Sequence, residues 1–166
     1  MRVLAIDPGN KTSGWVLMDG RTFLSGESEQ DNTELHRVIE SYRDVDLVAC
    51  EWIQSYGMTV GKEVFHTCRW SGRFQQVAEA IGLKWALVYR RDVKLYLCQD
   101  SRAKDTNVRQ AILDLYPATG GGSRPQIGTK KQRGPLYGVS GHMWPAVGLA
   151  LTVQESNRLS EVECVL

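Results

Sequence analysis

The sequence predicts an α/β fold in which helices flank a five-stranded mixed sheet. Five short apolar segments are typical of strands, whereas other segments repeat apolar residues every three to four positions, as amphipathic helices do. The order along the chain is three strands, a helix, a strand, a helix, a strand and then further helices. This order favours a mixed sheet covered by helices, and the length of 166 residues suits one domain spanning residues 1–166.

The predicted strands are residues 2–7, 13–20, 21–27, 46–51 and 84–89. The first strand ends in an Asp-Pro-Gly turn, and Asp19-Gly20 between the second and third is typical of a hairpin. The fourth strand ends in an acid, Glu51, and leads into a loop that contains two glycines.

The predicted helices are residues 32–43, 62–81 and 105–116, followed by a last helix near the C-terminus. This last helix is apolar on most sides, so we expect it to pack on the sheet. Proline is tolerated only in the first turn of a helix, so Pro145 requires this helix to begin no earlier than His142 or to kink there.

Charge is distributed unevenly along the chain, although the net charge is only +1. Residues 1–50 hold five basic and nine acidic side chains, whereas residues 84–135 hold eleven basic and four acidic ones. A basic half suits a polyanionic partner, although a solvated charged surface is an equal alternative. The segment 118–135 is basic and rich in glycine, which predicts a flexible loop.

The cysteines and the apolar runs exclude several classes of protein. Four cysteines are scattered without a CxxC pair, as expected for reduced thiols in the cytoplasm and not for a zinc site or a disulfide framework. No apolar run approaches the roughly 20 residues that span a bilayer, so we expect no membrane partner.

Two acids stand at the ends of predicted strands, Asp7 and Glu51. If those strands are neighbours, the two carboxylates project from one edge of the sheet and repel each other. A divalent cation relieves this repulsion, and hard oxygen ligands suit Mg²⁺ or Mn²⁺. The alternative is that Asp7 caps its turn and Glu51 pairs with a surface cation.

Four segments, in order, resemble RuvC-type Holliday junction resolvases of the RNase H-like superfamily. They are AIDPGNKTSGWVLMD, VACEWIQSYGM, VKLYLCQDSRAKDTNVRQAI and GVSGHMWPAVGLALT, which together extend over nearly the whole chain. The resemblance is greatest to phage-encoded members. It implies an RNase H-like fold and a cytoplasmic protein of a bacterial or phage-infected host cell.

The resemblance implies a metal site built from Asp7, Glu51 and His142, which match the family's catalytic positions. His142 can ligate the metal or act as a general base, and the alternative is a histidine that packs in the core or caps a helix. Pro145 falls where bacterial members have a last aspartate, and proline has no side chain that binds a metal. Either the three remaining residues suffice with water, or another acid substitutes, or cleavage is impaired. Asp105 is the nearest candidate substitute, although an N-cap of the 105–116 helix is the favoured interpretation of it.

The resemblance also implies contacts with DNA. Lys94 and Lys104 match two family lysines that face the junction, and either could equally be merely solvated. An aromatic side chain in the loop after the catalytic glutamate stacks on bases in the family, and the equivalent position here is Gln54. Trp52 and Tyr56 flank it, and either can serve as the stacking residue or pack in the core.

Three side chains of the glycine-rich segment, Lys130, Lys131 and Arg133, are expected to contact the phosphate backbone, which positions DNA without reading its sequence.

Three functions remain open from the sequence. The first is a Mg²⁺- or Mn²⁺-dependent endodeoxyribonuclease that acts as a homodimer and nicks four-way junctions symmetrically. The second is a related nuclease with looser substrates such as flaps or forks. The third is a junction-binding protein with weak or no cleavage, which Pro145 favours. The helix that begins at Lys62 is the expected dimer interface, because its apolar residues spread over more than one face.

Overall fold

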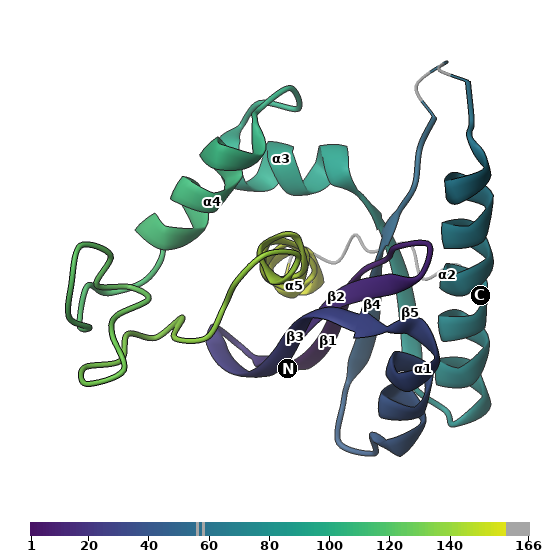
Figure 1. Ribbon diagram of the computed structural model, residues 1–166, viewed down its shortest axis with the longest axis horizontal. Helices are drawn as coiled ribbons and strands as arrows, with labels where there is room; N and C mark the ends of the chain where they lie inside the picture. The colour runs from purple at the N-terminus through teal and green to yellow at the C-terminus, as the bar shows by residue number, and fades with distance from the viewer. Residues whose placement is uncertain (56, 58, 159–166) are drawn as a thin grey trace.

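A central five-stranded sheet carries helices on both faces (Figure 1). The computed structural model describes residues 1–55, 57 and 59–158. The strands are β1 (Arg2–Asp7), β2 (Thr12–Asp19), β3 (Thr22–Asp31), β4 (Leu47–Trp52) and β5 (Lys84–Tyr89). The helices are α1 (Asn32–Ser41), α2 (Lys62–Ala80), α3 (Arg90–Cys98), α4 (Asp105–Asp114) and α5 (Met143–Arg158).

The strands are arranged in the order β3-β2-β1-β4-β5. Strand β1 pairs antiparallel with β2 and parallel with β4, while β2–β3 is antiparallel and β4–β5 parallel. The sheet is therefore mixed, as predicted, and the two strands that end in Asp7 and Glu51 are neighbours.

Alternating side chains of the strands build two separate cores. On β1, Val3 and Ala5 contact α5 and its surroundings, whereas Leu4 and Ile6 face α1 and α2. This alternation follows from the period of two residues in a strand, and a sheet covered on both faces needs apolar residues at both sets of positions. Helix α5 lies in the middle of the molecule, between the sheet and the pair α3–α4 (Figure 1).

The last helix confirms both expectations about it. Its apolar residues are buried: Ala146, Val147, Leu149, Ala150, Leu151 and Val153. It begins at Met143, so Pro145 lies in its first turn, where the missing amide hydrogen has no helical carbonyl to meet.

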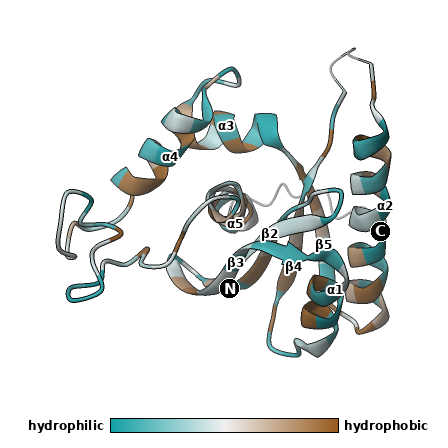
Figure 2. Ribbon diagram, viewed as in Figure 1, coloured by the Kyte–Doolittle hydropathy of each residue, from teal (hydrophilic) through white to brown (hydrophobic). Residues whose placement is uncertain are grey.

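Two elements differ from the prediction by more than two residues. Strand β3 extends to Asp31, beyond the expected end at residue 27, because it is the edge strand and its exposed polar positions carry no apolar pattern; Figure 2 draws it mainly as hydrophilic. Helix α3 was not predicted at all, because it follows β5 without any intervening turn.

The basic segment at 118–135 has no helix or long strand but is held by its own hydrogen bonds. The Gly121 amide donates to the Gln132 carbonyl at 2.9 Å, and the Gly134 amide donates to the Ile127 carbonyl at 2.9 Å. At Gly128 a Cβ would lie 2.3 Å from a neighbouring backbone nitrogen, so only glycine allows this close approach. The segment lies beyond α4, on the side of α5 opposite α2 (Figure 1). Its flexibility stays a prediction.

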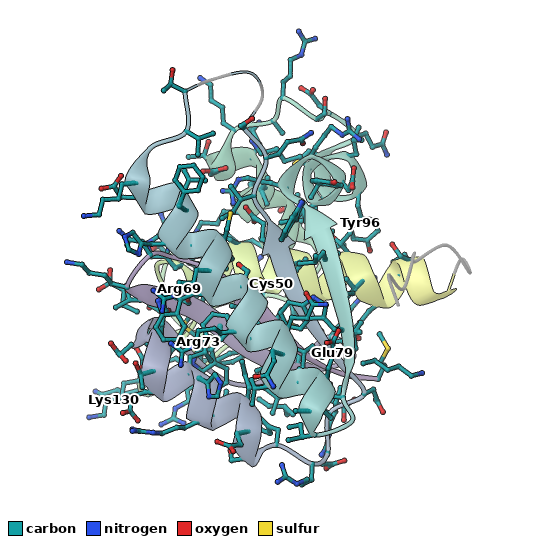
Figure 3. All side chains as sticks on the ribbon, turned by 90° about the vertical axis from the view of Figure 1, so that its right-hand side faces the viewer. Cys50, Arg69, Arg73, Glu79, Tyr96 and Lys130 are labelled. Atoms are coloured by element: carbon teal, nitrogen blue, oxygen red, sulfur yellow. The ribbon has the colours of Figure 1, made fainter. Side chains whose placement is uncertain are left out.

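Helix α2 and its C-cap bury three of the seven apolar residues that suggested a dimer interface, and three more are partly buried. Phe74, Val77 and Ala78 are buried against the sheet, while Phe65 is 67% exposed. The helix presents Arg69, Arg73 and Glu79 on the face turned to the viewer in Figure 3. Its outward face is therefore largely polar, and the homodimer stays a prediction.

No helix within the described residues is long and apolar enough to cross a membrane.

Candidate active site

The register of β1 and β4 brings the two predicted acids side by side. Ile6 pairs with Cys50, and the next residue on each strand is Asp7 and Glu51. Ala5 and Ala49, two residues earlier, belong to the core under α5, so the alternation of side chains turns both carboxylates toward the α5 face. They stand at the carboxyl ends of adjacent parallel strands, where α/β sheets commonly bind ligands.

His142 joins them from the residue before α5. Its ring Nδ1 lies 3.1 Å from Asp7 Oδ2, and its backbone amide donates to Ser28 Oγ at 3.0 Å. Two glycines permit this approach. A Cβ on Gly14 would lie 2.5 Å from the His142 carbonyl oxygen, and Gly141 has φ +46°, a conformation that favours glycine.

Burial raises the pKa of both strand-end carboxyl groups. The pKa of Asp7 is raised chiefly because burial removes water from the carboxylate, and the hydrogen bond and charge of His142 offset part of this shift. Burial likewise raises the pKa of Glu51, with Arg90 opposing the shift and Asp7 adding to it. Because burial disfavours the charged form of both carboxyl groups, a cation bound between them would stabilise that form.

Glu51 does have a cationic partner, as the alternative interpretation from the sequence allowed. Arg90 Nη1 donates to Oε1 and Oε2 of Glu51 at 3.1 and 3.0 Å. Asp7, by contrast, does not cap its own turn. There the Gly9 amide donates to Ser13 Oγ at 3.1 Å.

Asp105 is not the N-cap that the sequence favoured. Helix α4 begins at Asp105 itself, and its N-cap residue is Lys104, which makes no capping hydrogen bond through its side chain. The Asp105 carboxylate instead lies 2.9 Å from Arg90 Nη2 and 3.8 Å from Lys94 Nζ. A pair of cations from α3 thus draws this carboxylate toward the pocket.

These side chains line one pocket of about 600 Å³ between the sheet edge, α3, α4 and the start of α5. Its charged and polar lining includes Asp7, Glu51, Asp105, Arg90, Lys94, Arg109 and His142. Pro145 also lines it, at the position where the family's last acid is expected. The pocket is therefore acidic at the sheet edge and basic toward the two helices.

The remaining predicted residues lie outside this pocket. Lys104 is exposed at the start of α4, and Trp52, at the end of β4, is 36% exposed and hence able to stack on a ligand. In the basic segment, Lys130, Lys131 and Arg133 are exposed, and the Arg133 guanidinium stacks 4.7 Å from the Tyr137 ring. Tyr56 lies outside the described residues.

Arg90 and Arg109 are the two charged residues of the pocket that the sequence did not point to. A signal existed, because Val93, Tyr96 and Leu97 have helical spacing directly after the fifth strand. Recognising that helix would have placed Arg90 at its first residue, beside the strand end next to Glu51.

The donor chemistry of the strand ends fits a hard divalent cation. Mg²⁺ commonly uses one or two protein carboxylates and keeps several water ligands. Asp7 and Glu51 supply two such carboxylates from rigid strands. Among the described residues no group of three His, Cys, Asp or Glu side chains is already arranged to hold a metal ion. Asp7 and Glu51 would supply two ligands, and water would complete the coordination.

Comparison with known proteins places the fold. No family model matches the chain, and no curated protein matches it by sequence. Among solved structures, Thermus thermophilus RuvC superimposes with a TM-score of 0.71 at 19% identity, covering 98% of both chains. Thermus thermophilus RuvC in complex with a Holliday junction substrate gives the same TM-score at 17% identity, again with 98% of each chain covered. The protein therefore has the RNase H-like α/β fold of RuvC, as the resemblance in its sequence implied.

Proposed function

We propose that the protein is a metal-dependent endodeoxyribonuclease that nicks Holliday junctions or other branched DNA. The observation that carries this proposal is the placement of Asp7, Glu51 and His142 in one pocket at the ends of adjacent parallel strands. A structure of the same fold that holds a Holliday junction, although only 17% identical, supports branched DNA as the substrate class.

Each acid has a role that its surroundings favour. Asp7 and Glu51 are the proposed ligands of Mg²⁺ or Mn²⁺, because burial makes their charge costly until a cation compensates it. When bound, the cation would activate a water molecule and stabilise the leaving oxygen of the phosphodiester.

His142 is the proposed proton acceptor, or else a third metal ligand. If the Asp7 carboxylate accepts from Nδ1–H, which lies 3.1 Å away, a neutral imidazole would present Nε2 as the proton acceptor. The imidazole is 62% exposed, so its outer nitrogen is accessible to water and substrate.

Cations around the pocket would hold the DNA backbone. Lys94 and Arg109 line the same pocket as the acids, which suits a phosphate next to the scissile bond. Lys104 and the basic segment would extend this contact, and Trp52 would stack on an unpaired base at the branch point. A homodimer would place one pocket on each of two equivalent strands of a junction.

The experiment is a nicking assay on a synthetic four-way junction in Mg²⁺, Mn²⁺ or EDTA. We expect cleavage only with a divalent cation. Asp7→Asn and Glu51→Gln should each abolish cleavage while junction binding persists, because the phosphate contacts come from other residues. Asp114→Asn and Glu79→Gln are the matched controls, since both acids are exposed and outside the pocket. Cleavage by Asp7→Asn near the wild-type rate would exclude this metal site.

The second candidate is a junction-binding protein with weak or no cleavage. Pro145 favours it, since this residue faces the pocket without offering a ligand. Binding without nicking in either metal would establish this second function, and unpaired nicks on flaps or forks would indicate the looser nuclease.

A further inference from the structure

Arg90 connects two acids that come from different parts of the fold. It is the first residue of α3, directly after β5. Its Nη1 engages both carboxylate oxygens of Glu51 at 3.0 and 3.1 Å, and its Nη2 engages Asp105 at 2.9 Å. One guanidinium therefore bridges the end of β4 and the start of α4.

The side chains around this guanidinium are both acidic and cationic. Arg90 also lines a smaller pocket of about 270 Å³, whose other charged residues, Arg91, Lys94 and Arg102, are all cationic. Attraction by Glu51 and Asp105 directs the guanidinium toward the acids. A planar group with donors on two nitrogens can satisfy two carboxylates at once, which a lysine ammonium does less well.

We propose that Arg90 is a built-in counter-ion of the acidic pocket, which holds Glu51 and Asp105 in the absence of a divalent cation and competes with that cation for Glu51. This inference rests on the proposed metal-dependent function. Under this proposal Arg90 is a positioning residue. The affinity of the pocket for metal then depends on Arg90 as well as on the acids that would ligate the metal.

The competition follows from the contacts of Glu51. Both of its oxygens accept from Arg90, and Mg²⁺ requires a carboxylate oxygen at about 2.0–2.1 Å. Ligation therefore requires at least one charge-assisted hydrogen bond to break. From the usual strength of such bonds, we expect Arg90→Gln to tighten divalent-cation binding about ten- to a hundredfold. The divalent-cation affinity of Arg90→Lys, which keeps the charge but not the forked guanidinium, should lie between those of Arg90→Gln and the wild type.

The test measures Mn²⁺ binding to the DNA-free protein, using the electron paramagnetic resonance signal of free Mn²⁺. The matched control is Arg91→Gln, because Arg91 is the next residue of α3 and its ion pair is with Asp92, at 3.5 Å, outside the acidic pocket. The Mn²⁺ affinity of Arg91→Gln should stay within about twofold of that of the wild type, since an exposed charge outside the pocket is largely screened. Tighter binding by Arg90→Gln but not by Arg91→Gln supports the proposal.

A second readout is the thermal unfolding of the same proteins. Without metal, Arg90→Gln should unfold at a lower temperature than the wild type, because Glu51 and Asp105 lose their bridge. Saturating Mn²⁺ should raise its unfolding temperature by more than it raises that of the wild type, since tighter binding stabilises more at equal metal concentration. Should the glutamine variant fail to fold, the lysine variant carries the comparison.

The outcomes separate this inference from the proposed function. Suppose that Asp7→Asn abolishes Mn²⁺ binding but Arg90→Gln binds Mn²⁺ as tightly as the wild type or less tightly. This result would overturn the proposed role of Arg90 and leave the metal site intact. Absence of binding by both the wild type and Arg90→Gln overturns both proposals.

Discussion

Replacing Gly14 with alanine tests whether the approach of His142 to Asp7 depends on the absence of a side chain. Gly14 is the β2 residue that pairs with Asp7. A Cβ there would lie 2.5 Å from both the Cβ and the carbonyl oxygen of His142. The backbone before α5 would therefore have to move by about 1 Å to regain ordinary contact distances, as overpacked sites do.

The expected magnitudes follow from that displacement. Overpacking typically costs about 1–3 kcal/mol, and each kcal/mol lowers the melting temperature of a domain of this size by about 2–4 °C. Gly14→Ala should thus melt about 2–12 °C below the wild type. A displacement of about 1 Å at a catalytic group can reduce the rate about a hundredfold, so nicking should fall more than stability alone explains.

Thermal unfolding by circular dichroism and the junction nicking assay measure these two effects. The control is Gly72→Ala on the exposed side of α2, where a Cβ meets nothing within 4 Å. That change should stabilise the protein by about 0.5–1 kcal/mol and leave nicking unchanged. Wild-type melting and nicking in Gly14→Ala would refute the argument that this glycine positions His142.

Two further predictions concern the core and the basic segment. Burial raises the pKa of Tyr116 to about 12, and its hydroxyl has no hydrogen-bond partner among the described residues. Because this pKa lies above the ordinary value near 10 of the unfolded chain, the associated stability is complete below about pH 10 and is lost as the pH rises through about 12. Tyr116→Phe should therefore melt no lower than the wild type at pH 7, and it should lose less stability than the wild type between about pH 10 and pH 12. A lower melting temperature of the variant at pH 7 would contradict this. Changing Lys130, Lys131 and Arg133 together to glutamine should reduce the slope of log affinity against log salt for junction DNA, by up to about 0.9 for each DNA phosphate that these side chains neutralise in the wild type. Arg37→Gln, on α1, serves as control, and an unchanged slope in the triple variant would show that the segment is only a solvated surface.

The local patterns of the sequence determined most of the fold. Short apolar runs, helical periodicity and turn pairs placed the five strands and four of the five described helices, because burial on one or both faces dictates which positions are apolar. The restriction that Pro145 imposes on the last helix is equally local, so the start of α5 was predictable. Helix α3 was missed because no turn residue separates it from β5.

The positions of Asp7 and Glu51 at strand ends were also legible in the sequence. Their adjacency was conditional, since it depends on which strands pair, and the parallel register of β1 and β4 decided it. His142 came from the resemblance to RuvC, and the close approach of Gly14 explains how its ring reaches Asp7.

Only the tertiary structure could reveal the bridge from Glu51 through Arg90 to Asp105. These residues come from β4, α3 and α4, and no spacing in the chain brings them together. By local sequence alone Asp105 was a helix cap, because aspartate before a helical run usually caps it. In the folded protein the helix begins at Asp105 itself, so this residue is not the cap, and its carboxylate pairs with Arg90 instead.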